Sequence, residues 1–250
     1  MEIQLIRHAT LKIKFNNLTF LVDPMFSQKG SLDPVSNAAN EDRNPLVNLP
    51  VTVEEVIQDV DALIVTHLHR DHLDDAAIQA LPKEMAVFCQ PEDDLKLLDF
   101  GFTNVMKVET EMEWSGIKLS RTGGRHGTGE LAEAMGQVSG FVLATEAEET
   151  LYIAGDTVWC DEVEDAIKTT KPKVIVLNGG EAQFLTGDPI TMGFNDIEKV
   201  SSLASDSVIV VVHMETWNHC LLKRSTLKES VEANELTNVI VPDDGEKLSF

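Results

Sequence analysis

Residues 62–74 read ALIVTHLHRDHLD, an apolar run that leads into three histidines and an aspartate within six positions. His67 and His69 stand two apart, so an extended segment directs both imidazoles to the same side of the chain. Asp71 and His72 follow where the chain turns toward a helix. Imidazole nitrogen and carboxylate oxygen are ligands that a borderline divalent ion such as zinc accepts. Because the whole chain holds only seven histidines, this clustering indicates a metal site rather than a charged helix start on the surface.

Three more residues of the ligand type each lie where a strand is expected to end. His126 lies in the sequence GGRHGTG, Asp156 follows the run LYIA, and His213 follows the run VIVVV. In open α/β folds, sites form in the crevice outside the carboxyl ends of the strands. Each of these residues by itself fits an ordinary loop, but together with the first cluster they predict a larger set of ligands.

In chain order these residues resemble the metallo-β-lactamase superfamily. Its HxHxDH motif stands here at residues 67–72 and is followed in the family order by a histidine, a strand-end aspartate and a last histidine. The resemblance covers nearly the whole chain and implies a four-layer αββα sandwich, with two β-sheets face to face and helices outside. It also implies the ligands: His67, His69 and His126 for a first metal, Asp71, His72 and His213 for a second, and Asp156 as the bridge.

The opening of the chain suggests a closer likeness. The sequence IRHAT around His8, with FLVDP at residues 20–24, is similar to the ascorbate-6-phosphate lactonase-like branch. We expect His8 to point into the same cleft, as a substrate contact or as a neighbour of the metal ligands. His219 has the same expected role and also competes with His213 as the last ligand. His213 is favoured because it directly follows the apolar strand.

Two adjacent divalent ions can share one water, lower its pKa and stabilise the charge that develops on a carbonyl or phosphoryl oxygen. Asp71 is expected both to bind the second ion and to orient the attacking water. These features predict a binuclear metal hydrolase acting on a small ester, lactone or phosphoester, with zinc as the first choice of ion and manganese or iron as alternatives. An iron-dependent enzyme that oxidises thiols or persulfides is a second hypothesis. A non-catalytic metal-binding protein is the third, although no ligand position has been lost.

The charge of the chain limits its partners. Lys and Arg number 20 against 42 Asp and Glu, which gives a formal net charge of −22, and no run of basic residues occurs. A phosphate backbone would be repelled, so no nucleic-acid partner is expected. The predicted partner is a small-molecule substrate, and the sequence leaves homo-oligomerisation open.

The cysteines and the N-terminus predict a cytoplasmic protein. Cys89, Cys160 and Cys220 are odd in number and form no CxxC pair, so neither a disulfide framework nor a thiolate zinc site is indicated. The first residues lack a basic segment followed by an apolar one, and no run of 18 apolar residues exists, so neither export nor a membrane span is expected.

We expect one domain, residues 1–250, because α/β folds commonly reach this length. Periodicity alone predicts an α/β fold. Residues 25–50 contain three prolines and little periodicity, and are a candidate substrate lid or a surface loop. The expected strands are 3–7, 11–15, 18–22, 62–66, 85–89, 117–121, 138–145, 150–154, 174–177, 208–212 and 238–242. The expected helices are 74–81, 92–100, 161–169, 194–204 and 226–236.

Overall fold

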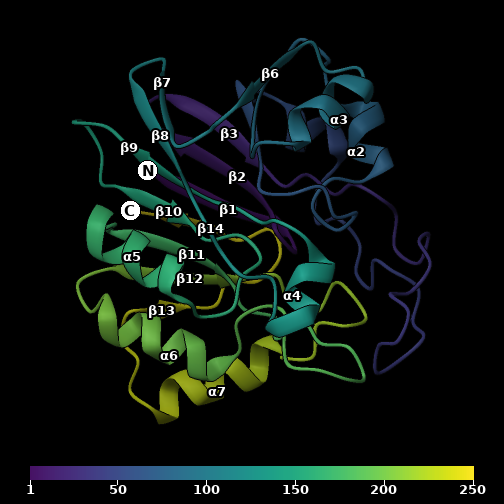
Figure 1. Cartoon of the computed structure of the whole chain (residues 1–250), viewed down its shortest axis with the longest axis vertical. Helices are drawn as coiled ribbons and strands as arrows, with labels where there is room; N and C mark the ends of the chain where they lie inside the picture. The colour runs from purple at the N-terminus through teal and green to yellow at the C-terminus, as the bar shows by residue number, and fades with distance from the viewer.

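Two seven-stranded sheets packed face to face form the centre of the computed structural model, which describes residues 1–250 (Figure 1). The first sheet contains, in spatial order, β14 (Lys247–Ser249), β1 (Glu2–Arg7), β2 (Thr10–Phe15), β3 (Leu18–Val22), β4 (Ala62–Val65), β5 (Ala86–Cys89) and β6 (Asn104–Lys107). The second contains β13 (Val239–Ile240), β12 (Val208–Val212), β11 (Val174–Asn178), β10 (Leu151–Ile153), β9 (Gly140–Ala144), β8 (Ile117–Thr122) and β7 (Glu111–Trp114).

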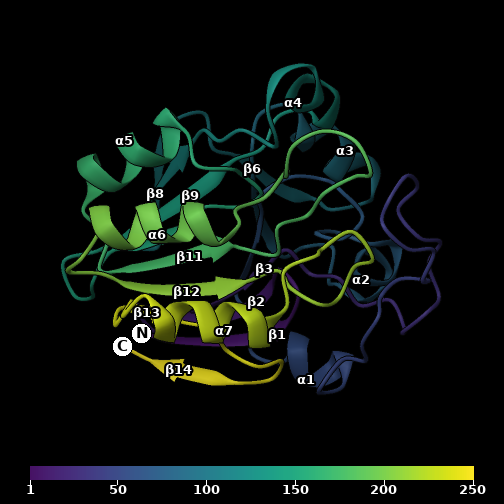
Figure 2. The ribbon, with the colours of Figure 1, turned by 90° about the horizontal axis from the view of Figure 1, so that it is seen from below.

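Helices cover the outer face of each sheet. On the first sheet these are α1 (Val53–Ile57), α2 (Asp75–Ala80) and α3 (Asp93–Asp99). On the second they are α5 (Asp161–Thr170), α6 (Phe194–Leu203) and α7 (Arg224–Ala233), of which α6 and α7 run along β11 and β12 in Figure 2. The remaining helix, α4 (Gly129–Met135), has no buried residue. None of the helices combines the length and the apolar character needed to cross a membrane.

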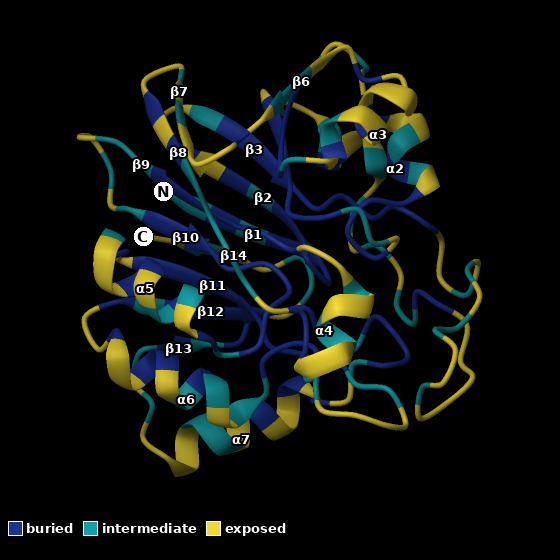
Figure 3. Cartoon of the chain, viewed as in Figure 1, coloured by how far each residue is buried: buried dark blue, intermediate teal, exposed yellow.

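The alternation of side chains along each strand explains the four layers. In β4, Ala62 and Ile64 are among the 22 buried side chains between the two sheets, whereas Leu63 and Val65 pack against the helices of the first sheet. A strand buried on both faces reads as a continuous apolar run, because successive side chains point to opposite faces. Figure 3 shows the strands as largely buried and the outer helix faces as exposed. The predicted αββα sandwich is confirmed.

The parallel strands determine where in the fold the site lies. Strands β3 to β6 pair in parallel in the first sheet, and β10 to β13 do so in the second. The carboxyl ends of parallel strands lie at one edge of a sheet, so the segments after β4, β10 and β12 meet there. A backbone hydrogen bond from His213 N to His8 O, 2.9 Å long, links the two sheets at this edge.

Five elements were not predicted, namely α1, α4, β6, β7 and β14. Helix α4 lacks a buried face and carries no apolar period. Edge strand β7 does alternate, as EMEW, with Met112 and Trp114 packed against the core, but the pattern spans only four residues. For α1 a signal existed, since Thr52 and Glu55 form a capping box that the sequence TVEE already contains. The expected last strand, 238–242, is reduced to the two residues of β13.

Residues 25–50 contain no helix or strand, but side chains from the body of the protein hold both ends. The Arg7 guanidinium donates to the backbone oxygens of Met25 and Ser27 at 3.0 Å and of Val47 at 2.9 Å. The Asp74 carboxylate accepts from the backbone of Phe26 and of Ser27. The ends of this segment are therefore fixed, and its role as a lid stays a prediction.

Candidate metal centre

Six of the seven histidines and two aspartates meet at the carboxyl edge of the sheets. They come from five segments that are distant in sequence: the β1–β2 turn, the β4–α2 segment, and the segments that follow β8, β10 and β12. In that order these segments supply His8; His67, His69, Asp71 and His72; His126; Asp156; and His213. The site is thus assembled by both sheets.

The β4–α2 segment owes its shape to hydrogen bonds that the motif itself supplies. The backbone N–H of His72 donates to the carbonyl oxygen of His69 at 2.9 Å, which forms a tight turn. Asp74 caps α2 by accepting from Ala77 N at 2.8 Å. Asp74 therefore orients the segment that carries four of the predicted ligands, a role that sequence reasoning missed.

The first group contains His67, His69 and His126, each with one nitrogen within 4.8 Å of the others. His126 Nδ1 donates to Ile190 O at 2.8 Å, which leaves Nε2 as the free lone pair. His67 Nε2 is buried and has no hydrogen-bond partner. Burial, with the neighbouring His72, holds the pKa of His67 well below its usual value, and burial also lowers the pKa of His126. Both are therefore neutral imidazoles, the form that binds a metal.

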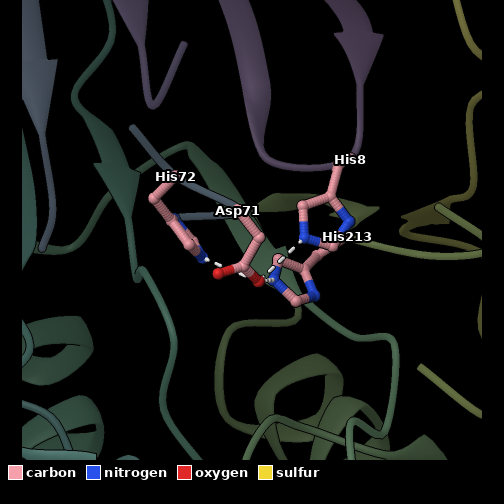
Figure 4. Close-up of side chains that lie close together, drawn as sticks. All are labelled: His8, Asp71, His72 and His213. Atoms are coloured by element: carbon pink, nitrogen blue, oxygen red, sulfur yellow. Dashed lines mark hydrogen bonds and ion pairs between the residues drawn. The ribbon is translucent and has the colours of Figure 1, made fainter. Parts of the chain in front are cut away.

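The second group contains His8, Asp71, His72 and His213, whose ligand atoms also lie within 4.8 Å of one another (Figure 4). Asp71 Oδ2 lies 3.2 Å from His8 Nε2, 3.5 Å from His213 Nε2 and 3.8 Å from His72 Nε2. His8 was expected as a substrate contact or a neighbour of the ligands, and the structure places its Nε2 directly against Asp71, among the potential ligand atoms.

Asp156 stands between the two groups. Its Oδ2 lies 3.2 Å from His72 Nε2 and 3.5 Å from His126 Nε2, and its Oδ1 lies 3.3 Å from His213 Nε2. Asn178 Nδ2 donates to Oδ1 at 2.7 Å and fixes the carboxylate. The preceding Gly155 has φ +70°, and a Cβ there would lie 2.6 Å from a backbone oxygen, so only glycine fits this turn. Asp156 therefore lies between the two groups, and its role as the bridge stays a prediction.

Asp23 supports the second group from behind. His72 Nδ1 donates to Asp23 Oδ2 at 2.8 Å, which leaves His72 Nε2 free to bind an ion. The backbone N–H and hydroxyl of Thr66 also donate to Asp23, at 2.8 and 2.7 Å. Asp23 directly follows β3, so the strand-end rule that found the other residues could have found it too.

Three of these residues adopt left-handed backbone conformations that side chains other than glycine rarely take. The φ angles are +60° for His8, +44° for Asp23 and +68° for His213. Such conformations cost of the order of 1–3 kcal/mol each and persist where surrounding contacts fix them, often at functional sites.

The buried carboxylates of the site are ionised, which favours the binding of cations. Burial opposes ionisation of Asp156, but His213 and His72 outweigh it and hold its pKa well below the usual range. Burial likewise opposes protonation of His213, but Asp156 outweighs it and raises the pKa to about 10. In the metal-free chain, protons on His213 and His72, whose pKa is also raised, balance the carboxylates. A bound cation would displace them.

The donor set fits divalent ions. The Nε2 atoms of His67, His72 and His213 are buried without a hydrogen-bond partner. His72 and His213 approach carboxylate oxygens closely, yet without the alignment of a hydrogen bond. Buried polar atoms without partners are rare in native proteins, and an ion between these converging nitrogens would satisfy them.

His219 lies outside both groups. It is buried, its ring centroid lies 6.3 Å from those of Trp217 and Phe184, and burial lowers its pKa to about 4. The structure brings His213, and not His219, against Asp71 and Asp156. The choice of His213 as the last ligand stays a prediction.

We expect His213→Ala to lose the second metal ion and His219→Ala to retain it. The reason is that, of these two histidines, only His213 places a nitrogen within 3.5 Å of oxygens of both Asp71 and Asp156. Elemental analysis of the two variants, prepared side by side, measures the ions per chain. Loss of an ion in His219→Ala with retention in His213→Ala would reverse the assignment.

Comparison with known proteins decides the family. The family described as Beta-lactamase superfamily domain matches residues 19–214. The UPF0173 protein YddR of Bacillus subtilis is 44% identical over 254 residues, which cover 100% of both chains. The chain belongs to the metallo-β-lactamase superfamily, in its UPF0173 family. A UPF0173 metal-dependent hydrolase of Koribacter versatilis is 25% identical over 197 residues, 72% of this chain and 76% of the relative.

Two solved structures are similar to this UPF0173 chain along its whole length. The isothiocyanate hydrolase from Delia radicum gut bacteria is 38% identical, with a TM-score of 0.95 over 100% of this chain and 99% of the other. A possible metal-dependent hydrolase from Veillonella parvula is 35% identical, with a TM-score of 0.97 and the same coverage. The predicted superfamily is confirmed, and the lactonase-like branch stays a prediction.

Proposed function

We propose that this UPF0173 chain is a hydrolase that uses two divalent metal ions to activate water against a small electrophilic substrate. The observation that carries the proposal is the position of Asp156, whose carboxylate contacts members of both ligand groups. The buried Nε2 atoms of His67, His72 and His213, which have no hydrogen-bond partner, supply nitrogens that can bind the ions. The names of the UPF0173 relatives as metal-dependent hydrolases support the same class of reaction.

The chain's own residues have distinct roles in this proposal. Ions bound at the two groups would supply Lewis acidity and an activated water. Asp156 holds the two groups in register, and Asn178 holds Asp156. Asp71 orients the attacking water, and His8 fixes the Asp71 carboxylate through its 3.2 Å contact. Zinc is the first choice for this imidazole-rich set, and the ligand types also accept manganese or iron.

Two classes of substrate suit this chemistry. Small esters, lactones and phosphoesters follow from the site alone. The isothiocyanate hydrolase at 38% identity favours isothiocyanates, in which the carbon of the N=C=S group is the electrophile. In that reaction the oxygen of water bonds to this carbon, and the bond between this carbon and the nitrogen breaks. Both protons of water end on the nitrogen: R–N=C=S + H₂O → R–NH₂ + O=C=S. We propose isothiocyanates as the first class to test.

We expect hydrolysis of small isothiocyanates, lactones or phosphoesters, and no detectable cleavage of RNA or DNA at physiological salt. A chain of net charge −22 cannot gather a long polyanion through counterion release, whereas ions at the centre still attract a small substrate. Amine release and loss of isothiocyanate absorbance measure the first activity, and gel assays measure the second.

Asp71→Ala is the control for both assays. Nuclease activity that disappears in Asp71→Ala would overturn the substrate class. Thiol-dependent oxygen uptake by iron-containing protein, with no hydrolysis of any of these small substrates, would instead support the redox hypothesis.

A further inference from the structure

A cavity of about 420 Å³ opens beside the first ligand group. His67 and His69 form one wall, and the rest comes from the start of α3 and from the segment that ends α4, including Met135. This volume lies within the range of pockets that hold small organic molecules. Because two potential metal ligands line it, a molecule whose reactive carbon lies at the ions can extend a substituent into this cavity.

A fixed carboxylate lines the cavity. Asp93, only 7% exposed, accepts one hydrogen bond at Oδ2 from Gln90 Nε2, 2.9 Å long. Gln90 is itself held, since its Nε2 also donates to Gln137 O at 3.0 Å and its Oε1 accepts from Ser139 Oγ at 2.8 Å. Asp93 lines the cavity, and its Oδ1 has no hydrogen-bond partner within the protein. It is therefore an oriented acceptor that is available to a ligand.

The charges around the cavity favour one kind of substituent. Glu92 and Asp93 face a single cation, Lys96, and the lining segment that ends α4 contributes no charge. Lys96 is exposed and has no ion pair, so it can turn its ammonium group to solvent, whereas Gln90 fixes Asp93. The net charge of −22 acts in the same direction. Beside Asp93 and Glu92, anionic groups are thus disfavoured and hydrogen-bond donors are favoured, whereas ions held by His67 and His69 would attract the reactive group of the substrate.

We infer that this cavity binds the organic substituent of the substrate and that Asp93 selects substituents carrying a hydroxyl, amine or ammonium group. The inference rests on the proposed function, because it needs the reactive carbon to lie at the ligand groups. It also narrows the substrate class, since a carboxylated or phosphorylated substituent would meet Asp93 and Glu92.

The kinetic test compares three benzyl isothiocyanates that carry, at the para position, hydroxymethyl, ethyl or carboxylate. We expect wild-type protein to prefer the hydroxymethyl compound and to discriminate against the carboxylate. Asp93→Asn should lower the ratio of kcat/KM for the hydroxymethyl and ethyl compounds by about 10-fold, the usual effect of a hydrogen bond to a charged group. Asp94→Asn is the matched control, because it removes the same charge from α3 outside the cavity. An unchanged ratio in Asp93→Asn would overturn the inference.

A second readout does not depend on turnover. In zinc-loaded protein labelled with ¹³C-methyl methionine, the Met135 signal, assigned with Met135→Leu, should shift on titration with benzyl alcohol and not with benzoate. In Asp93→Asn the affinity for benzyl alcohol should fall about 10-fold. Equal responses to the two probes, or an unchanged affinity in Asp93→Asn, would contradict the role of Asp93. If the Met135 signal responds as expected while no isothiocyanate is hydrolysed, the proposed substrate fails and the binding cavity stands.

Discussion

Asp156→Asn is expected to lower kcat/KM by about 10²-fold or more while the protein stays folded. The two oxygens of Asp156 lie near His72, His126 and His213, so this carboxylate holds both ligand groups together. Asparagine has nearly the same shape but carries no charge, and its amide nitrogen has no free lone pair to donate to a cation. The variant should therefore bind fewer ions, or hold them at a different spacing, while its fold stays intact.

Kinetics, elemental analysis and circular dichroism measure the three parts of this expectation. Asp165→Asn is a suitable control, because it makes the same change on α5, where the side chain is exposed and makes no ion pair. If Asp156→Asn kept two ions and full activity, Asp156 would not be the bridge.

Removal of metal is expected to abolish hydrolysis and to lower the thermal stability of the protein. Native protein should hold close to two divalent ions per chain, since two groups of ligand atoms are preformed. Only the folded chain assembles these ligands, so each ion at 100 times its Kd adds about 2.7 kcal/mol to the free energy of unfolding. Elemental analysis, activity after chelation, and Tm with and without zinc test this directly.

Binding should also release protons. The pKa of His213 is raised to about 10 in the metal-free chain, so this imidazole is protonated at neutral pH and must lose its proton to bind an ion. Metal affinity should therefore fall as the pH is lowered, and calorimetry in buffers of different ionisation enthalpy counts the protons. Protein that holds only trace metal after reconstitution with zinc, manganese and iron would contradict the metal centre.

Much of the fold could be predicted because the decisive signals are local. Apolar runs such as residues 208–212 follow from strands buried on both faces, and a ligand-type residue after each run follows from the meeting of parallel strand ends. Edge strand β7 escaped because its alternating pattern spans only four residues, and helix α4 escaped because it has no buried face that imposes a period. Where exposure is nearly uniform, the sequence has no apolar pattern to read.

The sequence by itself determined which residue types gather at the strand ends, because strand periodicity and the HxHxDH spacing are properties of short segments. Only the tertiary structure decided that His8 lies against Asp71, 63 positions away, and that Asp23 supports His72. It also decided the cavity beside His67, whose walls come from the β4–α2 segment, the start of α3 and the segment that ends α4. These contacts depend on how the two sheets and their helices pack in space. The number of residues between two segments does not give their distance in space when only the packing of the core brings them together.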